Sequence, residues 1–226
     1  MKTTKNVLII SFLILLTSCE RNQPNEISTE LKAINDVFVE LIEDTFYYHQ
    51  FLPPPPPPPL NAKDSLNNIE YEKQVDKKYQ EVKSDSFKII LAINDSLIST
   101  ATHLENDWLK SYFSSDSIAQ KYGYAFTSLV QGAKRNNFID INLISKTGRF
   151  ELKYKSGLKA DEFWSSNPDV YGFIVFSRIY FNQNMDRAVF YFGHICAPLC
   201  GAGYIVKIYK ENEIWKIDKK IGLWVS

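Results

Sequence analysis

The stretch GFIVFSRIYFNQNMDRAVFYFGHICAPLCGAGYIVKIYKENEIWKID, residues 172–218, decides the fold. It contains four runs rich in β-branched and aromatic residues, which favour strands, separated by short polar or Gly-rich segments. These runs are residues 172–181, 188–195, 204–209 and 214–218. Because three tight turns join them in chain order, the sequence predicts an antiparallel β-meander of about four strands. Residues 223–225 are expected to pack against this sheet.

The first half of the chain is predicted to be rich in helix. From Ile27 to Tyr48, apolar residues recur at alternating spacings of four and three, which predicts an amphipathic helix over residues 27–52 with one packing face. Further expected elements are a surface helix in residues 61–86, a buried strand in residues 87–93 and a helix in residues 97–113. All nine glycines lie at or after Gly123. This shift in composition predicts an α+β fold.

The chain begins MKTTKNVLIISFLILLTSC, residues 1–19, which has the pattern of an export signal. Lys2 and Lys5 give it a basic start, and a short apolar run follows from Val7 to Leu16. Ten residues of helix, at about 1.5 Å each, are too short to cross a hydrocarbon core of about 30 Å. We therefore predict a signal peptide in residues 1–18 and exclude it from the fold.

Residues Leu16 to Cys19 resemble the lipobox of bacterial lipoproteins, in which a leucine and two small residues precede a cysteine. The resemblance implies cleavage before Cys19 and acylation of its sulfur and amino group. Two or more acyl chains anchor a protein stably, whereas one binds only marginally. The predicted location is the cell membrane, with the outer membrane expected and the face left open. The membrane is thus a predicted partner, bound through these acyl chains.

The composition and charge of the chain after the signal peptide limit which partners and segments it can have. Without Lys2 and Lys5, 24 basic residues stand against 26 acidic ones, a net charge of −2, so no nucleic acid partner is expected. After a tether in residues 19–26 and the helix, residues 53–60 form a proline run, PPPPPPPL. Proline fixes φ, so this run predicts a stiff polyproline II segment, either a spacer or a ligand for an aromatic groove. Residues 61–226 are predicted to form a single α+β domain.

A wider resemblance covers the last quarter of the chain. The order FSRIYFN…RAVFYFGHICAPLCGAGYIVKIYK…WKIDK, behind a lipobox and a proline run, is similar to uncharacterised lipoproteins of Bacteroidota. The matching positions are Ser177, Arg178, Phe181, Asn182, Cys196, Cys200, Gly201, Gly203, Lys210 and Trp215. The resemblance implies the compartment and the architecture, and it assigns no catalytic residue.

With Cys19 acylated, Cys196 and Cys200 remain as an even pair in an oxidising compartment, which favours a disulfide. Gly201 and Gly203 are interpreted as permitting the turn back into the sheet. Two alternatives stay open. His194 and the two cysteines could contribute to a metal site, although structural zinc needs four ligands. A redox pair is less favoured, because the Cys-x₃-Cys spacing between strands offers no helix N-terminus to lower the thiol pKa.

Other motifs carry little chemistry, and we predict no catalytic, cofactor-binding or metal-binding residue. The chain has no Gly-x-Ser-x-Gly elbow, His-Glu-x-x-His motif or phosphate loop. Aromatic residues from Phe173 to Phe192 are interpreted as core, with a ligand cleft as the alternative. Bacteroidota-type proteins carry O-glycans at Asp-Ser-aliphatic sequences, so that resemblance implies Ser65 as a possible site. We interpret Asp161 and Glu162 as solvated.

The sequence therefore predicts a lipid-anchored cell-envelope protein, a binding or scaffolding module with a possible envelope protein as its partner. Two alternatives are an envelope hydrolase with an unrecognised site and a thiol or metal protein that uses His194, Cys196 and Cys200.

Overall fold

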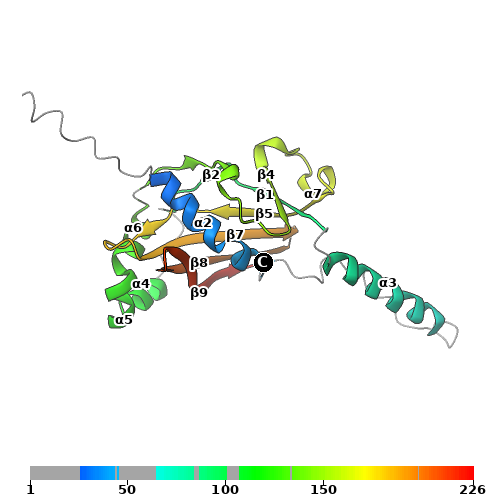
Figure 1. The fold of residues 1–226 in the computed structure, drawn as a ribbon, viewed down its shortest axis with the longest axis horizontal. Coiled ribbons are helices and arrows are strands. Elements are labelled where there is room, and N and C mark those ends of the chain that lie inside the picture. Colours follow the sequence, from blue (N-terminus) through cyan, green and yellow to red (C-terminus); the bar gives the residue numbers. More distant parts are fainter. Residues whose placement is uncertain are drawn as a thin grey trace, which may run out of the picture.

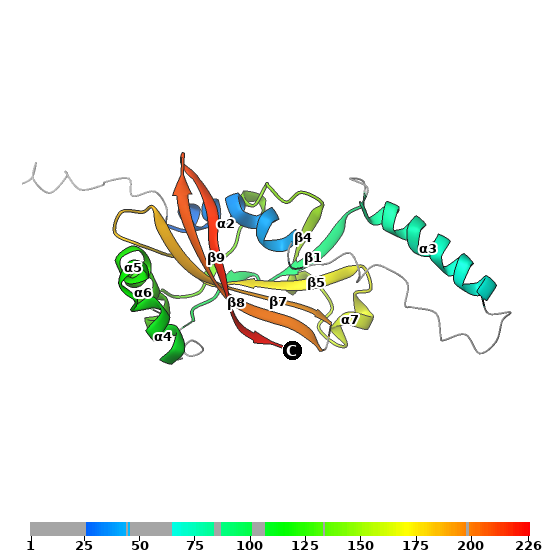
Figure 2. The same cartoon turned by 90° about the horizontal axis from the view of Figure 1, so that it is seen from below.

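The computed structural model describes residues 26–43, 45, 65–83, 87–100, 107–132, 134–197 and 199–226. One large mixed sheet carries helix α2 on one face and helices α4 to α6, with α7, on the other (Figures 1 and 2). The principal strands are β1 (Ile89–Ile93), β4 (Phe150–Tyr154), β5 (Val170–Phe176), β6 (Tyr180–Phe181), β7 (Arg187–Ala197), β8 (Cys200–Glu211) and β9 (Ile214–Val225). A separate pair consists of β2 (Ser96–Leu97) and β3 (Asn137–Phe138).

The predicted antiparallel strands are present in the C-terminal half. β5 pairs with β7, β7 with β8 and β8 with β9, in chain order and antiparallel, as the turn pattern predicts. The sheet is larger than four strands, because β1 pairs in parallel with both β4 and β5 and extends it on that side. The α+β class and the C-terminal strands are therefore confirmed, and the size of the sheet is corrected.

The predicted strand at residues 172–181 is divided. β5 ends at Phe176 and β6 begins at Tyr180. Between them, the Ser177 hydroxyl donates to the carbonyl of Arg178 and accepts the Tyr191 backbone N–H, both at 2.8 Å. The side chain thus replaces a backbone partner of β7 and allows the chain to leave the sheet.

The end of the chain also differs from expectation. Residues 223–225 do not lie on the sheet but form the end of β9, where Trp224 pairs with Gly203 and Val225 with Ala202. β9 is therefore a twelve-residue edge strand. Its lysines, including Lys216 and Lys219, are of the kind that protects an exposed edge from pairing with other chains.

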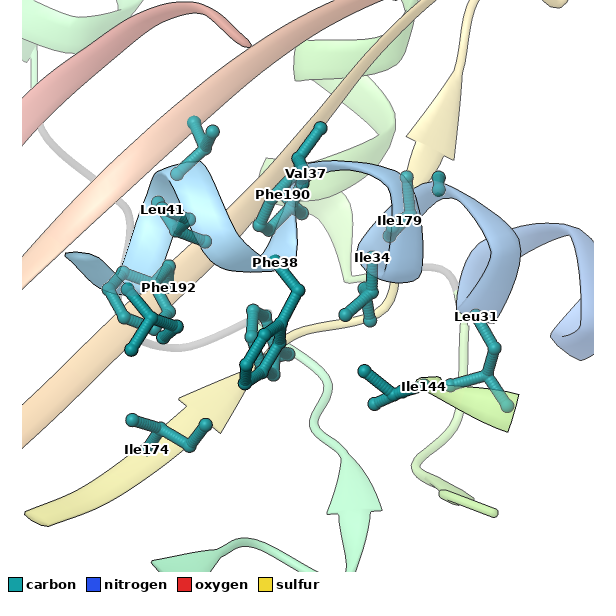
Figure 3. Close-up of a cluster of buried hydrophobic side chains, with 14 of the residues drawn as sticks. Leu31, Ile34, Val37, Phe38, Leu41, Ile144, Ile174, Ile179, Phe190 and Phe192 are labelled. Atoms are coloured by element: carbon teal, nitrogen blue, oxygen red, sulfur yellow. The ribbon is translucent and has the colours of Figure 1, made fainter. Parts of the chain in front are cut away.

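Helix α2 (Glu26–Glu43) supplies one side of the main core. The apolar stripe predicted from the sequence is its buried face, and Leu31, Ile34, Phe38 and Leu41 are at most 1% exposed. Figure 3 shows these side chains directed onto residues of β5 and β7, among them Ile174 and the two rings labelled on β7. Burial of each such side chain contributes roughly 1.5–3 kcal/mol, so the helix and the sheet form one folded unit.

The opposite face of the sheet carries a second core. Helix α4 (Asp107–Phe113), α5 (Asp116–Ile118), the π-helix η3 (Ala119–Gly123) and α6 (Tyr124–Gln131) cover one end of that face. Their apolar side chains pack against Val189, Ile205 and Ile221. A predicted helix beginning near residue 97 is corrected, since Ser96–Leu97 forms β2 and the helix begins at Asp107.

The surface helix predicted in residues 61–86 is present as α3 (Ser65–Lys83), and it projects from the body of the molecule (Figure 1). The predicted buried strand in residues 87–93 is β1. The signal peptide, the tether and the proline run lie outside the described residues, as do residues 46–52 of the predicted first helix. Ser65 is the first residue of α3, and its side chain is outside the described part. No helix among the described residues has the length and apolarity needed to span a membrane.

Candidate functional site

The Cys196–Cys200 disulfide predicted from the sequence is present at the turn between β7 and β8, with Cα atoms 5.2 Å apart. Ala197 pairs with Cys200 in the register, so the bond closes the end of the hairpin. Because both sulfurs are joined, neither is a thiolate for a metal. In the described part of the chain, no three His, Cys, Asp or Glu residues gather as metal ligands.

His194 lies beside this hairpin and belongs to an aromatic stack. Its ring is 6.1 Å from that of Phe192 and 6.2 Å from that of Tyr204, both nearly parallel. Burial, with a smaller contribution from the charge of Lys220, lowers the pKa of His194 to about 4. The imidazole is therefore neutral at physiological pH and serves as a packed ring.

Gly203 has a different role from the one predicted, because it lies within β8 and not at the turn. A Cβ at Gly203 would lie 2.1 Å from Nε1 of Trp224, and one at Gly193 would lie 2.6 Å from the Tyr191 hydroxyl. Trp224 Nε1–H donates to that hydroxyl at 3.2 Å. These glycines therefore leave a flat surface on which two large rings lie, rather than permitting a turn.

The candidate site lies at the end of the sheet that carries the disulfide. It is a pocket of about 360 Å³ between the sheet and the connection from β4 to β5. Figure 2 shows α7, which belongs to this connection, on the face of the sheet opposite α2. Phe173 and Ile195 form its floor and are cross-strand partners on β5 and β7. Phe163 and Trp164 form a wall, and Lys155 and Ala160 complete the lining.

Short helices in the connection position the wall. Lys155 lies in the 3₁₀ turn η5 (Lys155–Gly157), and Phe163 and Trp164 lie in α7 (Phe163–Ser166). The Asn167 side chain, directly after α7, binds the backbone of Lys159 before it. Its Oδ1 accepts the Lys159 N–H at 3.2 Å, and its amide group donates to the Lys159 carbonyl at 2.9 Å. Hydrogen bonds within the loop thus hold the wall in place.

Lys155 is the charged residue of the lining. Its Nζ lies 4.6 Å from the centre of the Phe173 ring, a cation–π contact. Within the described residues Lys155 makes no salt bridge. The pKa of Asp95 is lowered chiefly by hydrogen bonds from Ser156, with a smaller contribution from the charge of Lys155. The pocket therefore combines three aromatic rings with one ammonium group.

A buried ion cluster ties α2 to the loop between β5 and β6. Glu30 is fully buried, and its carboxylate accepts Arg178 Nε at 2.9 Å, Arg178 Nη2 at 2.8 Å and the Ile179 backbone N–H at 3.0 Å. Lys134 Nζ donates to the same carboxylate at 2.9 Å and to Glu26 at 2.8 Å. Arg178, which belongs to the motif noted in the sequence, therefore has a structural role in this cluster.

A second cluster joins the helices to β8 and β9. Lys207 forms a salt bridge with Asp218 at 3.0 Å, and its Nζ lies 4.7 Å from the centre of the Tyr122 ring and 5.6 Å from that of Tyr112. Burial, with the charge and hydrogen bond of Asp218, raises the pKa of Tyr122 well above its usual value. The phenol thus stays protonated and donates to the carboxylate, so this acid is also paired within the fold.

The sequence located only part of the pocket. The aromatic residues from Phe173 to Phe192 were interpreted as core, with a ligand cleft as the alternative, and each interpretation holds for part of them. Phe190 and Phe192 are core, whereas Phe173 faces the pocket. Lys155 and the two aromatic residues of α7 were missed. The adjacent pair FW in a polar segment, residues 155–169, was the available signal.

Comparison of the chain with models of protein families, with curated proteins and with solved structures finds no match. The assignment of a function therefore rests on the geometry of the chain itself.

Proposed function

We propose that the protein is a lipid-anchored binding protein of the cell envelope, and that it binds a small molecule in the pocket between Trp164 and Phe173. The observation that carries the proposal is the pocket itself, an aromatic hollow of about 360 Å³ beside the disulfide hairpin. Small-molecule sites have volumes of this order and are lined mainly by apolar and aromatic side chains with few polar groups.

The partial exposure of the apolar side chains in the pocket supports a role in ligand binding over a role in core packing. Elsewhere on the sheet, the apolar side chains of β5 and β7 that face α2 are buried completely, as Ile174 and Phe190 are. At the pocket, Ile195 is 38% exposed and the rings of Phe163, Trp164 and Phe173 are half-buried. Burial of this apolar surface by a ligand would be favourable at about 25 cal/mol per Å².

The anchor part of the proposal rests on the sequence around Cys19. The lipobox resemblance supports acylation of Cys19 and attachment to the outer membrane. Two acyl chains would keep the protein on the membrane permanently. The O-glycan at Ser65 and an envelope protein as a further partner stay predictions.

The anchor is tested by mass analysis of the full protein extracted from its native membrane. An acylated Cys19 at the N-terminus is expected, and a Cys19→Ala variant should retain its signal peptide without lipid. An unacylated Cys19 in membrane-extracted wild-type protein would refute the anchor and leave the pocket untouched.

The pocket is tested with phenylnaphthylamine, an uncharged apolar fluorophore, added to the full-length protein. Binding is expected, and Trp164→Ala should weaken it about tenfold because the variant removes the largest wall. The control is Trp108→Ala, which removes an exposed indole from α4 outside the pocket and should leave the affinity within about twofold. Failure of Trp164→Ala to change probe binding would reject the binding function.

A further inference from the structure

We propose that the ligand of this pocket is an amphipathic anion, a flat apolar ring system that carries one carboxylate, sulfonate or phosphate group. This inference rests on the proposed binding function and adds the chemical class of the ligand. It follows from three properties of the lining: the single ammonium group, the orientation of the rings, and the scarcity of other polar partners.

The charge of the ligand follows from Lys155. Of the six residues that line the pocket, it alone is charged, and in the described part of the chain its ammonium makes no salt bridge. The ammonium lies over the Phe173 ring at 4.6 Å, which places the charge directly at the floor of the pocket. An anion bound on that floor would gain a charge-assisted hydrogen bond, the stronger class of hydrogen bond.

Among the described residues, none of the neighbouring acids forms a salt bridge with this ammonium. Asp161 and Glu162 are exposed on the loop that carries the wall, and the Glu162 carboxylate accepts the Ser165 hydroxyl at 3.2 Å. Asp95 accepts the Ser156 backbone N–H at 3.0 Å. The exposed carboxylates of Asp161 and Glu162 are screened at physiological ionic strength, where the Debye length is about 8 Å. Asp95 is partly buried, and the charge of Lys155 makes only a smaller contribution to its lowered pKa than the hydrogen bonds from Ser156.

The shape of the ligand follows from the rings. Phe163 and Trp164 meet at 5.1 Å with an interplanar angle of 89°, so they form a right-angled corner. Phe173 and Ile195 provide a floor below that corner. A flat ring can contact one face and one edge of this corner at once, and such offset or edge-to-face contacts are the preferred geometries of aromatic pairs.

The same lining disfavours sugars. A sugar presents many hydroxyl groups, and each one buried without a partner costs free energy. The side chains of Ala160, Phe163, Phe173 and Ile195 offer no hydrogen-bonding group, and Trp164 offers one donor. A ligand with one polar end and an apolar body matches this distribution.

The test compares two probes that share their aromatic skeleton and differ in charge. Anilinonaphthalene sulfonate carries one anionic group, and phenylnaphthylamine carries none. Both are titrated into the full-length wild-type protein and its variants, with probe fluorescence as the readout. Lys155→Gln should weaken the sulfonate about five- to tenfold and change the affinity for the neutral probe by less than about twofold.

A matched control removes the same charge from the same loop. Lys159→Gln substitutes an exposed lysine that lies outside the lining, and both probes should retain their wild-type affinities within about twofold. In addition, Trp164→Ala should weaken both probes, because the ring wall serves either one. Circular dichroism of each variant confirms that the fold is retained.

Each outcome separates the two proposals. If both probes require Trp164 but Lys155→Gln weakens them equally or not at all, the anionic class is overturned while the binding function stands. Equal losses of sulfonate binding in Lys155→Gln and Lys159→Gln would indicate general surface charge and would also overturn the class. If neither probe responds to Trp164→Ala, the binding function itself fails.

Discussion

Substitution of Glu30 by glutamine should destabilise the protein by about 3–5 kcal/mol. Glu30 is fully buried, and its carboxylate is the principal counter-charge of the Arg178 guanidinium, whose side chain is 7% exposed. Removing one partner of a buried ion pair leaves an uncompensated charge in a medium of low polarity, which typically costs this much. For comparison, the total stability of a domain is about 5–15 kcal/mol.

The geometry places the cost near the lower end of that range. Glu26 lies 3.5 Å from Arg178 Nη2 and can compensate part of its charge. The Lys134 side chain is 18% exposed and can reach water when its partner is lost. The substituted glutamine could still accept the backbone N–H of Ile179 through its side-chain carbonyl oxygen. We therefore expect about 3 kcal/mol, because Arg178 alone is left without a full counter-charge.

The assay is urea unfolding of full-length wild-type and variant proteins, followed by tryptophan fluorescence. Glu26→Gln is the matched control, since it removes the same charge one turn earlier on α2 from a side chain that is 61% exposed. An exposed ion pair contributes only about 0–1 kcal/mol, so this variant should cost less than about 1 kcal/mol. Equal costs for the two variants, or a cost below about 1 kcal/mol for Glu30→Gln, would refute the assignment of the buried cluster.

Three further changes test the hairpin end of the sheet. Gly203→Ala should lower the free energy of unfolding by about 1–3 kcal/mol and shift tryptophan emission, because the new methyl group meets the Trp224 indole, whereas Gly222→Ala has open space and should cost under about 0.5 kcal/mol in the same unfolding assay. His194 has a folded pKa of about 4, below its unfolded value of 6.5, so it stays neutral in the fold while the unfolded chain takes up a proton. The unfolding free energy should therefore fall by up to about 3 kcal/mol as the pH falls from about 6.5 to 4, and a His194→Phe variant should lack this part of the decrease. Reduction of the Cys196–Cys200 disulfide should cost about 2 kcal/mol in thermal unfolding, because the closed loop is short, and an unchanged midpoint would contradict its presence.

The C-terminal strands, the buried face of α2 and the disulfide were predicted correctly, because residues close together in the sequence indicate each of them. The strands from residue 188 onward are rich in β-branched and aromatic residues and are separated by short turns, so composition and turn residues were sufficient to predict them. The apolar stripe of α2 predicted its buried face in the same way. The disulfide was predicted by counting cysteines in a chain that was expected to be exported, an argument that needs no geometry.

Non-local pairing explains what the sequence did not predict. β4 alternates apolar and charged residues over only five positions, and its parallel partner β1 is about sixty residues away, so a sequence pattern does not indicate the pair. Gly203 was interpreted as a turn residue because its neighbour Trp224 is fixed only by the register of β8 and β9. The pocket was missed for the same reason: β5, β7 and the connection carrying Trp164 contribute to it, and the topology of the sheet alone brings them together.

The start of α2, the described element that follows the proposed anchor in the chain, lies at the opposite end of the sheet from α7. Glu26 begins α2 and is bound to Lys134, close to the end of α6. In both views α7, which carries two residues of the pocket lining, lies at the other end of the sheet (Figures 1 and 2). Six residues separate Cys19 from Glu26, and the seven Cα-to-Cα steps, at about 3.5 Å each, reach at most about 24 Å. An acylated Cys19 would therefore hold the start of α2 within about 24 Å of the membrane, whereas the pocket is lined by residues at the other end of the sheet. A soluble ligand could then enter the pocket without passing between the protein and the lipid surface.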